Sequence, residues 1–302
     1  MPRPDCIGAR NDSENMKVYL TLLVGVAAMS FASIFIRLAE APPLVIAAYR
    51  LTIAALVFLP FAPSKWSKTC RQVSRRDVLL LLFASLFLAL HFALWISSLK
   101  NTSIASSVIL VTSNPIFVAI FSYFLWKEKM TRLMIGGMAL ALGGAVLISY
   151  GDFALGGTAL LGDALAVLAA LVWGIYLVTA RHLRARIDFL SFVTFIYAGA
   201  AVFLLIAVAI GGYSLFGYST QTYLMMALVA LVPQLIGHSA ANFALRFIPA
   251  TLVAVAILGE PVGATLLGYF ILEEAPGLNE IAGGVLVLAG IFAVLKRSPK
   301  RG

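Results

Sequence analysis

Long apolar segments alternate with short polar breaks along almost the whole chain. Ten of these segments approach the roughly 20 residues that an α-helix needs to cross a bilayer. They cover residues 18–37, 44–62, 77–99, 103–126, 132–150, 159–181, 190–212, 221–247, 249–272 and 279–296. The pattern therefore predicts an all-α integral membrane protein with ten transmembrane helices.

The composition agrees with a membrane protein. Of the 302 residues, 62% are hydrophobic and 12% are charged, whereas soluble domains carry about 25% charged residues. The first apolar run, Val18–Arg37, is long for the core of a signal peptide and lacks a small-residue cleavage site, so we expect it to be retained. The polar segment before it is expected to be a disordered tail, with translation starting at Met1 or at Met16.

The net charge of +9 could indicate a nucleic-acid partner, but the basic residues lie in short gaps between apolar segments. If the chain has ten spans, the 22 lysines and arginines, apart from Arg37, Lys100 and Arg50, all fall on the same side of the membrane. Arg37 and Lys100 fall on the other side, and Arg50 lies within a span. This asymmetry predicts that both termini are cytoplasmic. Cys6 and Cys70 then face a reducing compartment, so no disulfide is expected.

The second half of the chain repeats the first. A shift of 146 residues places Pro115 on Pro261 and Glu128 on Glu274 without a gap between them. Because each repeat has five spans, the second repeat enters the membrane in the opposite orientation, as in many alternating-access transporters. The predicted units are a cytoplasmic tail (residues 1–17), two five-helix repeats (18–150 and 151–296) and a basic cytoplasmic tail (297–302).

Glycines recur in register in the last span of each repeat. Gly137 and Gly144, like Gly283 and Gly290, are seven residues apart and share one helix face. Small residues let helix backbones approach closely in lipid. We expect these faces to make structural contacts, either within the chain or in a homodimer.

Several segments also carry a family resemblance. They are residues 41–50 (APPLVIAAYR), the proline-containing fourth span, residues 259–274 (GEPVGATLLGYFILEE), and the pair Trp173-Gly174 early in the second repeat. In the first repeat, Phe31-Ala32 stands in place of that pair. Taken in this order, they resemble EamA-type members of the drug/metabolite transporter superfamily over essentially the whole chain.

The resemblance implies ten helices around a central cavity lined by spans one, three, four, six, eight and nine. It also implies export or exchange of amino acids or related metabolites, since relatives include exporters of aromatic amino acids. Members differ widely in substrate, so the resemblance implies only the class.

A charged side chain at the bilayer centre costs about 2.5–3.5 kcal/mol on insertion scales, so each one needs a reason. Glu260 lies near the middle of the ninth span, directly before Pro261, which frees a backbone carbonyl near Ile257. An acid in this place suits a substrate ammonium group or a proton. The alternative is a buried ion pair with a basic residue that holds two helices together.

Arg50 lies about two turns inside the outer end of the second span. The second repeat has Ile196 or Tyr197 at the matching position. We expect Arg50 to snorkel towards the outer surface and to pair there with an acid or a helix end. The alternative is that it binds a substrate carboxylate.

Polar stripes lie on the third and eighth spans. His91 and Trp95 are four residues apart, and His238 and Asn242 repeat that spacing. Because residues four apart share a helix face, the two stripes could face one cavity. Interhelical hydrogen bonding is the alternative.

Two aromatic residues, Trp173 and Tyr176, lie deep in the sixth span and could stack on an apolar or aromatic substrate. Core packing is the commoner use of such residues. Asn114 and Gln234 are the remaining notable polar groups in the spans. The candidate substrate-binding or coupling residues are Glu260, His91, Trp95, Asn114, Trp173, Tyr176, His238, Asn242 and Arg50.

The sequence thus predicts a transporter that exports or exchanges amino acids or related small metabolites across the bacterial cytoplasmic (inner) membrane by alternating access. No Walker-type glycine loop is present, and the histidines and acid lack metal-ligand spacing, so no cofactor or metal is expected. A channel-like facilitator and an intramembrane enzyme are the alternatives. A channel would need rings of charge or a carbonyl filter, and an enzyme would need clustered catalytic groups.

Overall fold

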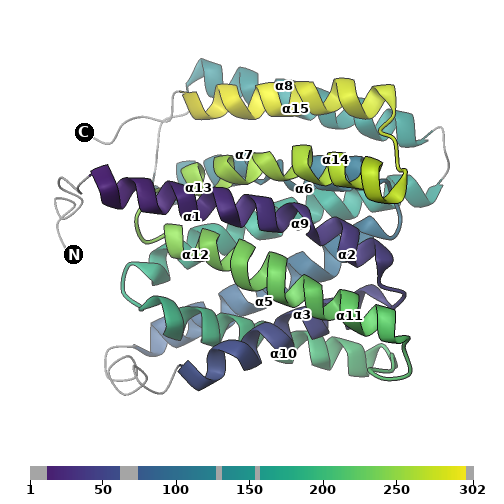
Figure 1. Cartoon of the computed structure of the whole chain (residues 1–302). Coiled ribbons are helices and arrows are strands. Elements are labelled where there is room, and N and C mark those ends of the chain that lie inside the picture. The colour runs from purple at the N-terminus through teal and green to yellow at the C-terminus, as the bar shows by residue number, and fades with distance from the viewer. Residues whose placement is uncertain (1–11, 62–73, 127–130, 154–156, 297–302) are drawn as a thin grey trace.

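The computed structural model describes residues 12–61, 74–126, 131–153 and 157–296. Every regular element within these ranges is a helix, which confirms the all-α prediction for this part of the chain. Figure 1 labels most of the elements, which are α1 (Asp12–Ser30), α2 (Ala32–Leu38), α3 (Pro43–Phe58), η2 (Leu59–Phe61), α5 (Arg75–Leu99), α6 (Ile104–Val111), α7 (Asn114–Trp126), α8 (Arg132–Phe153), α9 (Gly157–Arg184), α10 (Phe189–Ile210), α11 (Thr220–Val229), η3 (Ala230–His238), α12 (Ser239–Ala244), α13 (Ala250–Ala256), η4 (Ile257–Gly259), α14 (Glu260–Leu272) and α15 (Leu278–Lys296).

Some sequence-based predictions concern residues outside these ranges. They include residues 1–11 and 297–302 of the predicted tails, and Glu128 of the repeat comparison. The first helix begins at Asp12, so it extends into the segment that was expected to be a tail.

Helix geometry changes at the prolines. Pro115 and Pro261 are the second residues of α7 and α14, directly after the breaks that separate them from α6 and α13. Proline has no N–H to donate to the preceding turn, so the helix before it is interrupted. Pro233 lies inside η3, a stretch of nine residues in π-helical geometry between α11 and α12. Such irregular turns are frequent at functional sites.

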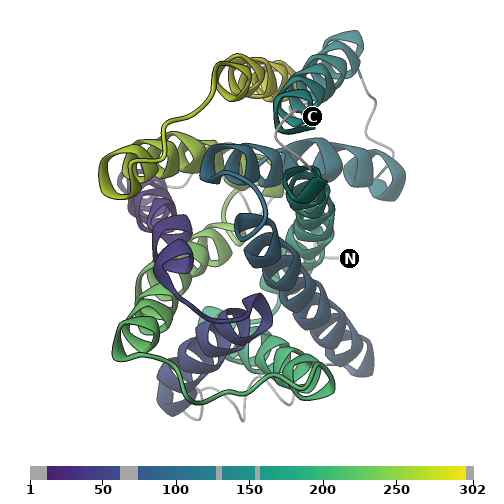
Figure 2. The ribbon, with the colours of Figure 1, turned by 90° about the vertical axis from the view of Figure 1, so that its right-hand side faces the viewer.

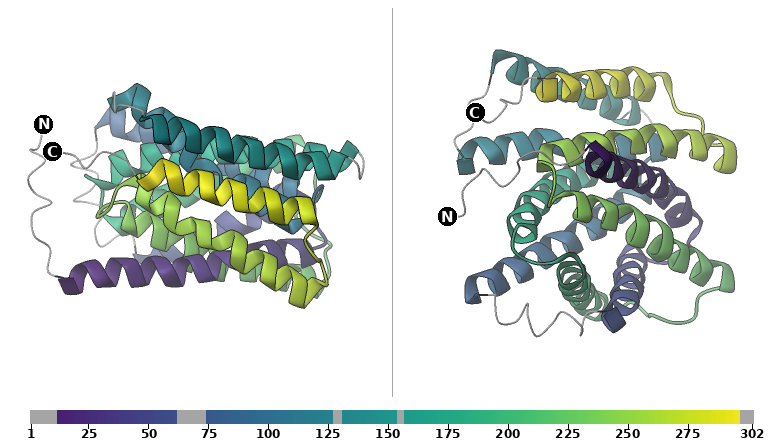
Figure 3. Two further views of the ribbon diagram at one scale, coloured as in Figure 1. Left: turned by 90° about the horizontal axis from the view of Figure 1, so that it is seen from above. Right: turned by 60° about the vertical axis from the view of Figure 1, so that its left-hand side comes forward.

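The helices lie alongside one another in a bundle (Figure 1). Viewed along the bundle, α8 and α15 lie together at one edge, while the other helices surround the centre (Figure 2). Figure 3 shows the α8–α15 pair from above, with the two helices side by side. The core of the bundle is apolar and includes the completely buried side chains of Ile46, Phe92 and Phe192.

Glycines allow α8 and α15 to pack at close range. A Cβ atom added at Gly144 would lie 2.8 Å from the backbone nitrogen of Val287, and one at Gly290 would lie 2.6 Å from that of Ala141. Only glycine permits so close an approach of two helix backbones. The glycine faces predicted for the fifth and tenth spans therefore pack against each other within the chain.

Within the described ranges, eight helical stretches are long and apolar enough to cross a membrane. They are Met16–Leu38, Pro43–Phe61, Arg75–Leu99, Ile104–Phe121, Gly157–Arg184, Phe189–Ile210, Thr220–Ala244 and Leu252–Leu272. Two shorter apolar segments, Ile135–Ile148 and Leu278–Gly290, lie within α8 and α15. Large apolar side chains also cover the outside of the bundle, as Leu23, Leu79 and Phe270 illustrate. Helices that are apolar on every face fit a lipid environment.

Candidate functional site

A small polar cavity lies inside the bundle, where the breaks before α7 and α14 meet α5, α9 and η3. Its volume is about 20 Å³, which is room for about one water molecule. The residues that line it are His91, Trp95, Val111, Thr112, Asn114, Trp173, His238, Ile257 and Glu260. The cavity therefore brings together most of the predicted site residues from five separate parts of the chain.

Aromatic rings form one wall of this cavity. The ring centroid of Trp173 lies 4.7 Å from that of His91 and 5.1 Å from that of His238. His91 and Trp95 are stacked with their centroids 6.2 Å apart. The predicted stripes on the third and eighth spans thus meet through His91, Trp95 and His238. Among the described residues, no group of three histidine, cysteine or acidic side chains could hold a metal ion.

Three predicted site residues, Arg50, Tyr176 and Asn242, lie outside the cavity lining. The Tyr176 hydroxyl donates to Asn242 Oδ1 at 2.7 Å, and Asn242 Nδ2 donates to the Tyr197 hydroxyl at 3.2 Å. These bonds join α9, α10 and α12, which is the interhelical alternative considered for Asn242. Asn242 is therefore bonded to Tyr176 and Tyr197 and does not line the cavity with His238.

The backbone of α9 orients the ring of His91. Its Nδ1 lies 3.1 Å from the carbonyl oxygen of Ala169. Because a carbonyl can only accept a hydrogen bond, Nδ1 carries a proton in this arrangement. In the neutral ring, Nε2 is therefore left as an acceptor.

Glu260 is the acidic residue of the cavity. It is the first residue of α14, and its side chain is 6% exposed. Arg50 attracts its charge, but no salt bridge or hydrogen bond to the Glu260 carboxylate is found within the described chain. The ion pair considered from the sequence is therefore an attraction at a distance, and the carboxylate keeps its full capacity to accept hydrogen bonds.

Arg50 is completely buried. Its Nε donates to Gln234 Oε1 at 2.7 Å, and its Cζ lies 3.9 Å from the ring centroid of Phe92 and 5.8 Å from that of Trp95. Nη1 and Nη2 have no hydrogen-bond partner among the residues that the structure describes. The expectation that Arg50 snorkels to the outer surface is wrong, because α3 packs against α5, α10 and η3, and these helices enclose the guanidinium group.

Sequence reasoning gave no role to Phe92, Thr112 or Gln234. Gln234 had a signal, since a polar residue beside Pro233 within a span indicates an irregular turn. Thr112 had a weaker signal in its position before Asn114-Pro115. A phenylalanine such as Phe92 gives none, because it looks like any other apolar residue of a span.

A second polar cluster closes one end of the bundle; we call Arg37, Ser103, Ser106, Glu274 and Glu280 the Arg37 cluster. Arg37 Nη1 donates to the carbonyl of Leu99 at 2.5 Å. Arg37 Nη2 donates to the carbonyl of Thr102 at 2.8 Å and to both carboxylate oxygens of Glu274 at 3.2 Å. One arginine therefore joins the ends of α2, α5 and α14.

The acids of the Arg37 cluster are held by backbone and serine groups. Glu274 Oε1 accepts the backbone N–H of Ile104 at 2.5 Å. Glu280 accepts hydrogen bonds from the hydroxyls of Ser103 and Ser106 and from the backbone N–H of Gly277. Every charged side chain of the cluster thus has hydrogen-bond partners.

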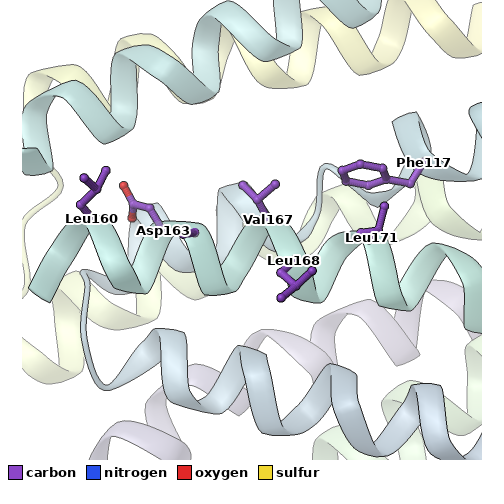
Figure 4. Close-up of a pocket in the computed structure, with 7 residues that line it drawn as sticks. Phe117, Leu160, Asp163, Val167, Leu168 and Leu171 are labelled. Atoms are coloured by element: carbon purple, nitrogen blue, oxygen red, sulfur yellow. The ribbon is translucent and has the colours of Figure 1, made fainter.

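A larger hollow lies on the side of the bundle between α7 and α9 (Figure 4). Its volume is about 450 Å³, and its lining is Phe117, Leu160, Asp163, Ala164, Val167, Leu168 and Leu171. The single polar side chain of this lining, Asp163, accepts a hydrogen bond from Thr102 Oγ1 at 3.0 Å. This hollow is an apolar surface groove and lacks the convergent polar groups of the central cavity.

The fold and its buried polar cavity define a multi-pass helical membrane protein. The chain belongs to the EamA-like transporter family, which matches it twice, over residues 16–150 and 160–296. It is similar to the transporter YdfC of Bacillus subtilis, with 27% identity over 95% of this chain and 93% of that protein. It is also similar to a transporter of Archaeoglobus fulgidus, with 23% identity over 93% and 97% of the two chains.

A solved crystal structure is among those with a similar fold. It covers 95% of this chain and 98% of its own chain, with a TM-score of 0.67 and 19% sequence identity. The family and the relatives point to a transporter with a small-molecule substrate and not to an enzyme.

Proposed function

We propose that the protein is a secondary transporter that exports or exchanges amino acids or related small metabolites across the bacterial cytoplasmic membrane by alternating access. The central cavity is the proposed substrate site. The observation that supports this most strongly is that Glu260, Asn114, His91 and His238 converge on one buried cavity in an apolar bundle. Ionisable groups inside a membrane usually mark a substrate or ion pathway.

The proposed topology has ten spans, with α8 and α15 added to the eight long apolar stretches. Basic residues support the orientation. Arg75, Arg132 and Arg184 lie at the helix ends of one side of the bundle, whereas Arg37 and Lys100 lie at the opposite side. The side that is richer in basic residues is proposed to be cytoplasmic.

An inverted repeat is the proposed design, and the helix bounds support it. α3 begins at Pro43 and α10 at Phe189, while α7 begins at Asn114 and α14 at Glu260, so both pairs have the offset of 146 residues seen in the sequence. The bond from Thr102 to Asp163 ties the start of α9 to the end where α2 finishes. The first helices of the two halves therefore run in opposite directions.

The small volume of the cavity supports a transport cycle in which the protein changes conformation. A volume of about 20 Å³ is far too small for an amino acid, so the site must expand when substrate binds. The Arg37 cluster joins Arg37 and Ser103 of the first half to Glu274 and Glu280 of the second half, at the side proposed to be outside. We propose this cluster as the outer gate, which opens when the cavity faces outward.

Counterflow in proteoliposomes tests the proposed function. Purified protein is reconstituted, the vesicles are loaded with a single amino acid or metabolite, and uptake of the labelled compound is followed. Saturable uptake that internal substrate accelerates is expected of a carrier. Uptake that never saturates would indicate a channel, and release of a chemically altered product would indicate an enzyme.

A further inference from the structure

Several buried polar atoms at or beside the central cavity have no hydrogen-bond partner within the described chain. They include Nη1 and Nη2 of Arg50, Nε1 of Trp95, Oδ1 of Asn114 and Nδ1 of His238. Folded proteins leave few buried polar atoms unpaired, and groups of them call for an explanation. A ligand bound at this place could complete their hydrogen bonds.

Hydrogen-bond donors with a positive charge lie in one part of the site, and acceptors with a negative charge lie in another. Arg50 and Trp95 supply N–H donors and a positive charge, and they lie 5.8 Å apart, measured from Cζ to ring centroid. Asn114 Oδ1 and the Glu260 carboxylate supply acceptors and a negative charge. Arg50 comes from α3, which packs on α5 and α10, whereas Glu260 comes from α14, which packs on α1, α2 and α6 (Figure 1).

Arg50 and Glu260 interact electrostatically without forming a salt bridge. Arg50 acts electrostatically on Glu260 and also on His91 and His238, so its field reaches three residues that line the cavity. A site with one positive and one negative group that are kept apart matches a ligand with the same two charges and no net charge. A dianion such as a phosphate ester would meet repulsion from Glu260.

We propose, building on the transport function above, that Arg50 binds the carboxylate of a zwitterionic α-amino acid through Nη1 and Nη2, while Glu260 binds its ammonium group. Guanidinium and carboxylate form paired, charge-assisted hydrogen bonds. Phe92 covers the guanidinium and Gln234 holds its Nε. The ring of Phe92 therefore moves aside when the cavity expands.

The proposal is tested on purified wild-type protein by ligand-induced thermal shift and by counterflow with each proteinogenic L-amino acid. The best amino acid is then compared with its decarboxylated amine and its deaminated acid. Both analogues are expected to bind at least about tenfold more weakly, because each lacks one charge-assisted contact. An amine that binds as tightly as the amino acid would overturn the proposal.

Substitution assigns the carboxylate contact to Arg50. In Arg50→Gln, the affinity for the amino acid is expected to fall at least about tenfold, while the affinity for the amine is unchanged. The ratio of the two affinities should therefore approach one. Arg50→Lys keeps the charge and is expected to retain part of the preference. An unchanged ratio of amino-acid affinity to amine affinity in Arg50→Gln would overturn the assignment. If that variant does not fold, an unchanged ratio in Arg50→Lys would overturn it.

Arg184 offers a matched control. It is also a buried arginine, but its Nε and Nη1 donate to the carbonyls of Asn242 and Ile187. Arg184→Gln is expected to lower thermal stability and to leave the ratio of amino acid to amine unchanged. If wild-type protein transports another metabolite but no amino acid, this inference fails and the proposed transport function stands. If it transports nothing that is offered, the proposed function fails as well.

Discussion

The central cavity and the Arg37 cluster are both polar sites in an apolar bundle, but they differ in how their polar atoms are paired. In the Arg37 cluster, Arg37 and Glu274 bond to each other and to the backbone at the helix ends. At the cavity, Trp95 Nε1, Asn114 Oδ1 and His238 Nδ1 have no hydrogen-bond partner in the described part of the chain. The polar groups of the Arg37 cluster form hydrogen bonds that hold the fold together. Those of the central cavity remain free to bind a ligand.

This difference separates stability from activity. An unpaired buried polar group costs roughly 1–3 kcal/mol of stability, so removing one from the cavity should leave the fold intact or even stabilise it. Removing a paired group from the Arg37 cluster leaves its partners unsatisfied. Substitutions in the two places should therefore have opposite signatures.

Glu260→Gln should have the largest effect of all on transport. The amide keeps the shape of the side chain but removes the charge, so flux should fall roughly ten- to hundredfold. The melting temperature should change little, because an amide costs less to bury than a carboxylate. If the carboxylate carries a proton in the cycle, the pH dependence of flux should also flatten.

Glu273→Gln is the matched control for Glu260, because Glu273 is an exposed acid at the other end of α14. It should leave both flux and stability unchanged. Wild-type flux with unchanged pH dependence in Glu260→Gln would remove this residue from the mechanism. Loss of stability in Glu260→Gln would indicate that its main role is to balance the charge of Arg50.

The α8–α15 contact tests whether stability can be lost without any change in polarity. Gly144→Ala introduces a Cβ that would lie 2.8 Å from the Val287 nitrogen, and overpacking of this kind costs about 1–3 kcal/mol. Gly143→Ala, whose Cβ would meet nothing within 4 Å, should be neutral or slightly stabilising. Thermal unfolding in detergent distinguishes the two, and equal melting temperatures would contradict the packing.

Arg37→Ala should loosen the end of the bundle and lower stability by about 1–2 kcal/mol, since several carbonyl and carboxylate acceptors lose their donor. It should also open the cavity to the outside. The measurement is the rate at which an impermeant thiol reagent labels Thr112→Cys in cells, with Cys6 and Cys70 replaced by serine. An unchanged labelling rate would argue against an outer gate at this place.

Lys100 should give the smallest effect. Burial lowers the pKa of its ammonium group from the ordinary 10.5, and the charge of Arg37 lowers it further. Between the lowered pKa and 10.5, the unfolded chain binds more protons than the folded chain, so stability rises with pH in this window. Lys100→Gln should abolish that rise. Because Nζ donates to the carbonyl of Ala39 at 2.7 Å, the substitution should lower stability by about 0.5–1.5 kcal/mol at neutral pH. A rise that persists in the variant would point to another group.

Much of this architecture could be predicted from the sequence. The apolar runs locate the helices, and Pro115 and Pro261 locate the breaks that place Asn114 and Glu260 at the cavity. The glycines of α8 and α15 identify a close helix contact, because nothing else explains their spacing in apolar helices. These features depend on local chemistry, which a sequence displays directly.

The direction in which individual side chains point from their helices was harder to predict. In a helix that is apolar on every side, periodicity does not show which face is buried. Arg50 was expected at the surface because it lies about two turns inside the outer end of its span, but its side chain is buried under Phe92. Asn242 was predicted on the cavity face by its spacing from His238, but the tyrosines of α9 and α10, Tyr176 and Tyr197, bond it instead.

The small volume of the cavity, about 20 Å³, has a consequence for measured affinity. A conformation that cannot hold the ligand contributes nothing to binding, so the apparent dissociation constant equals the intrinsic one divided by the fraction of molecules that are open. If one molecule in a hundred is open, binding is a hundredfold weaker than the contacts alone would give. A change far from the ligand that favours the open population should therefore tighten binding without adding any contact.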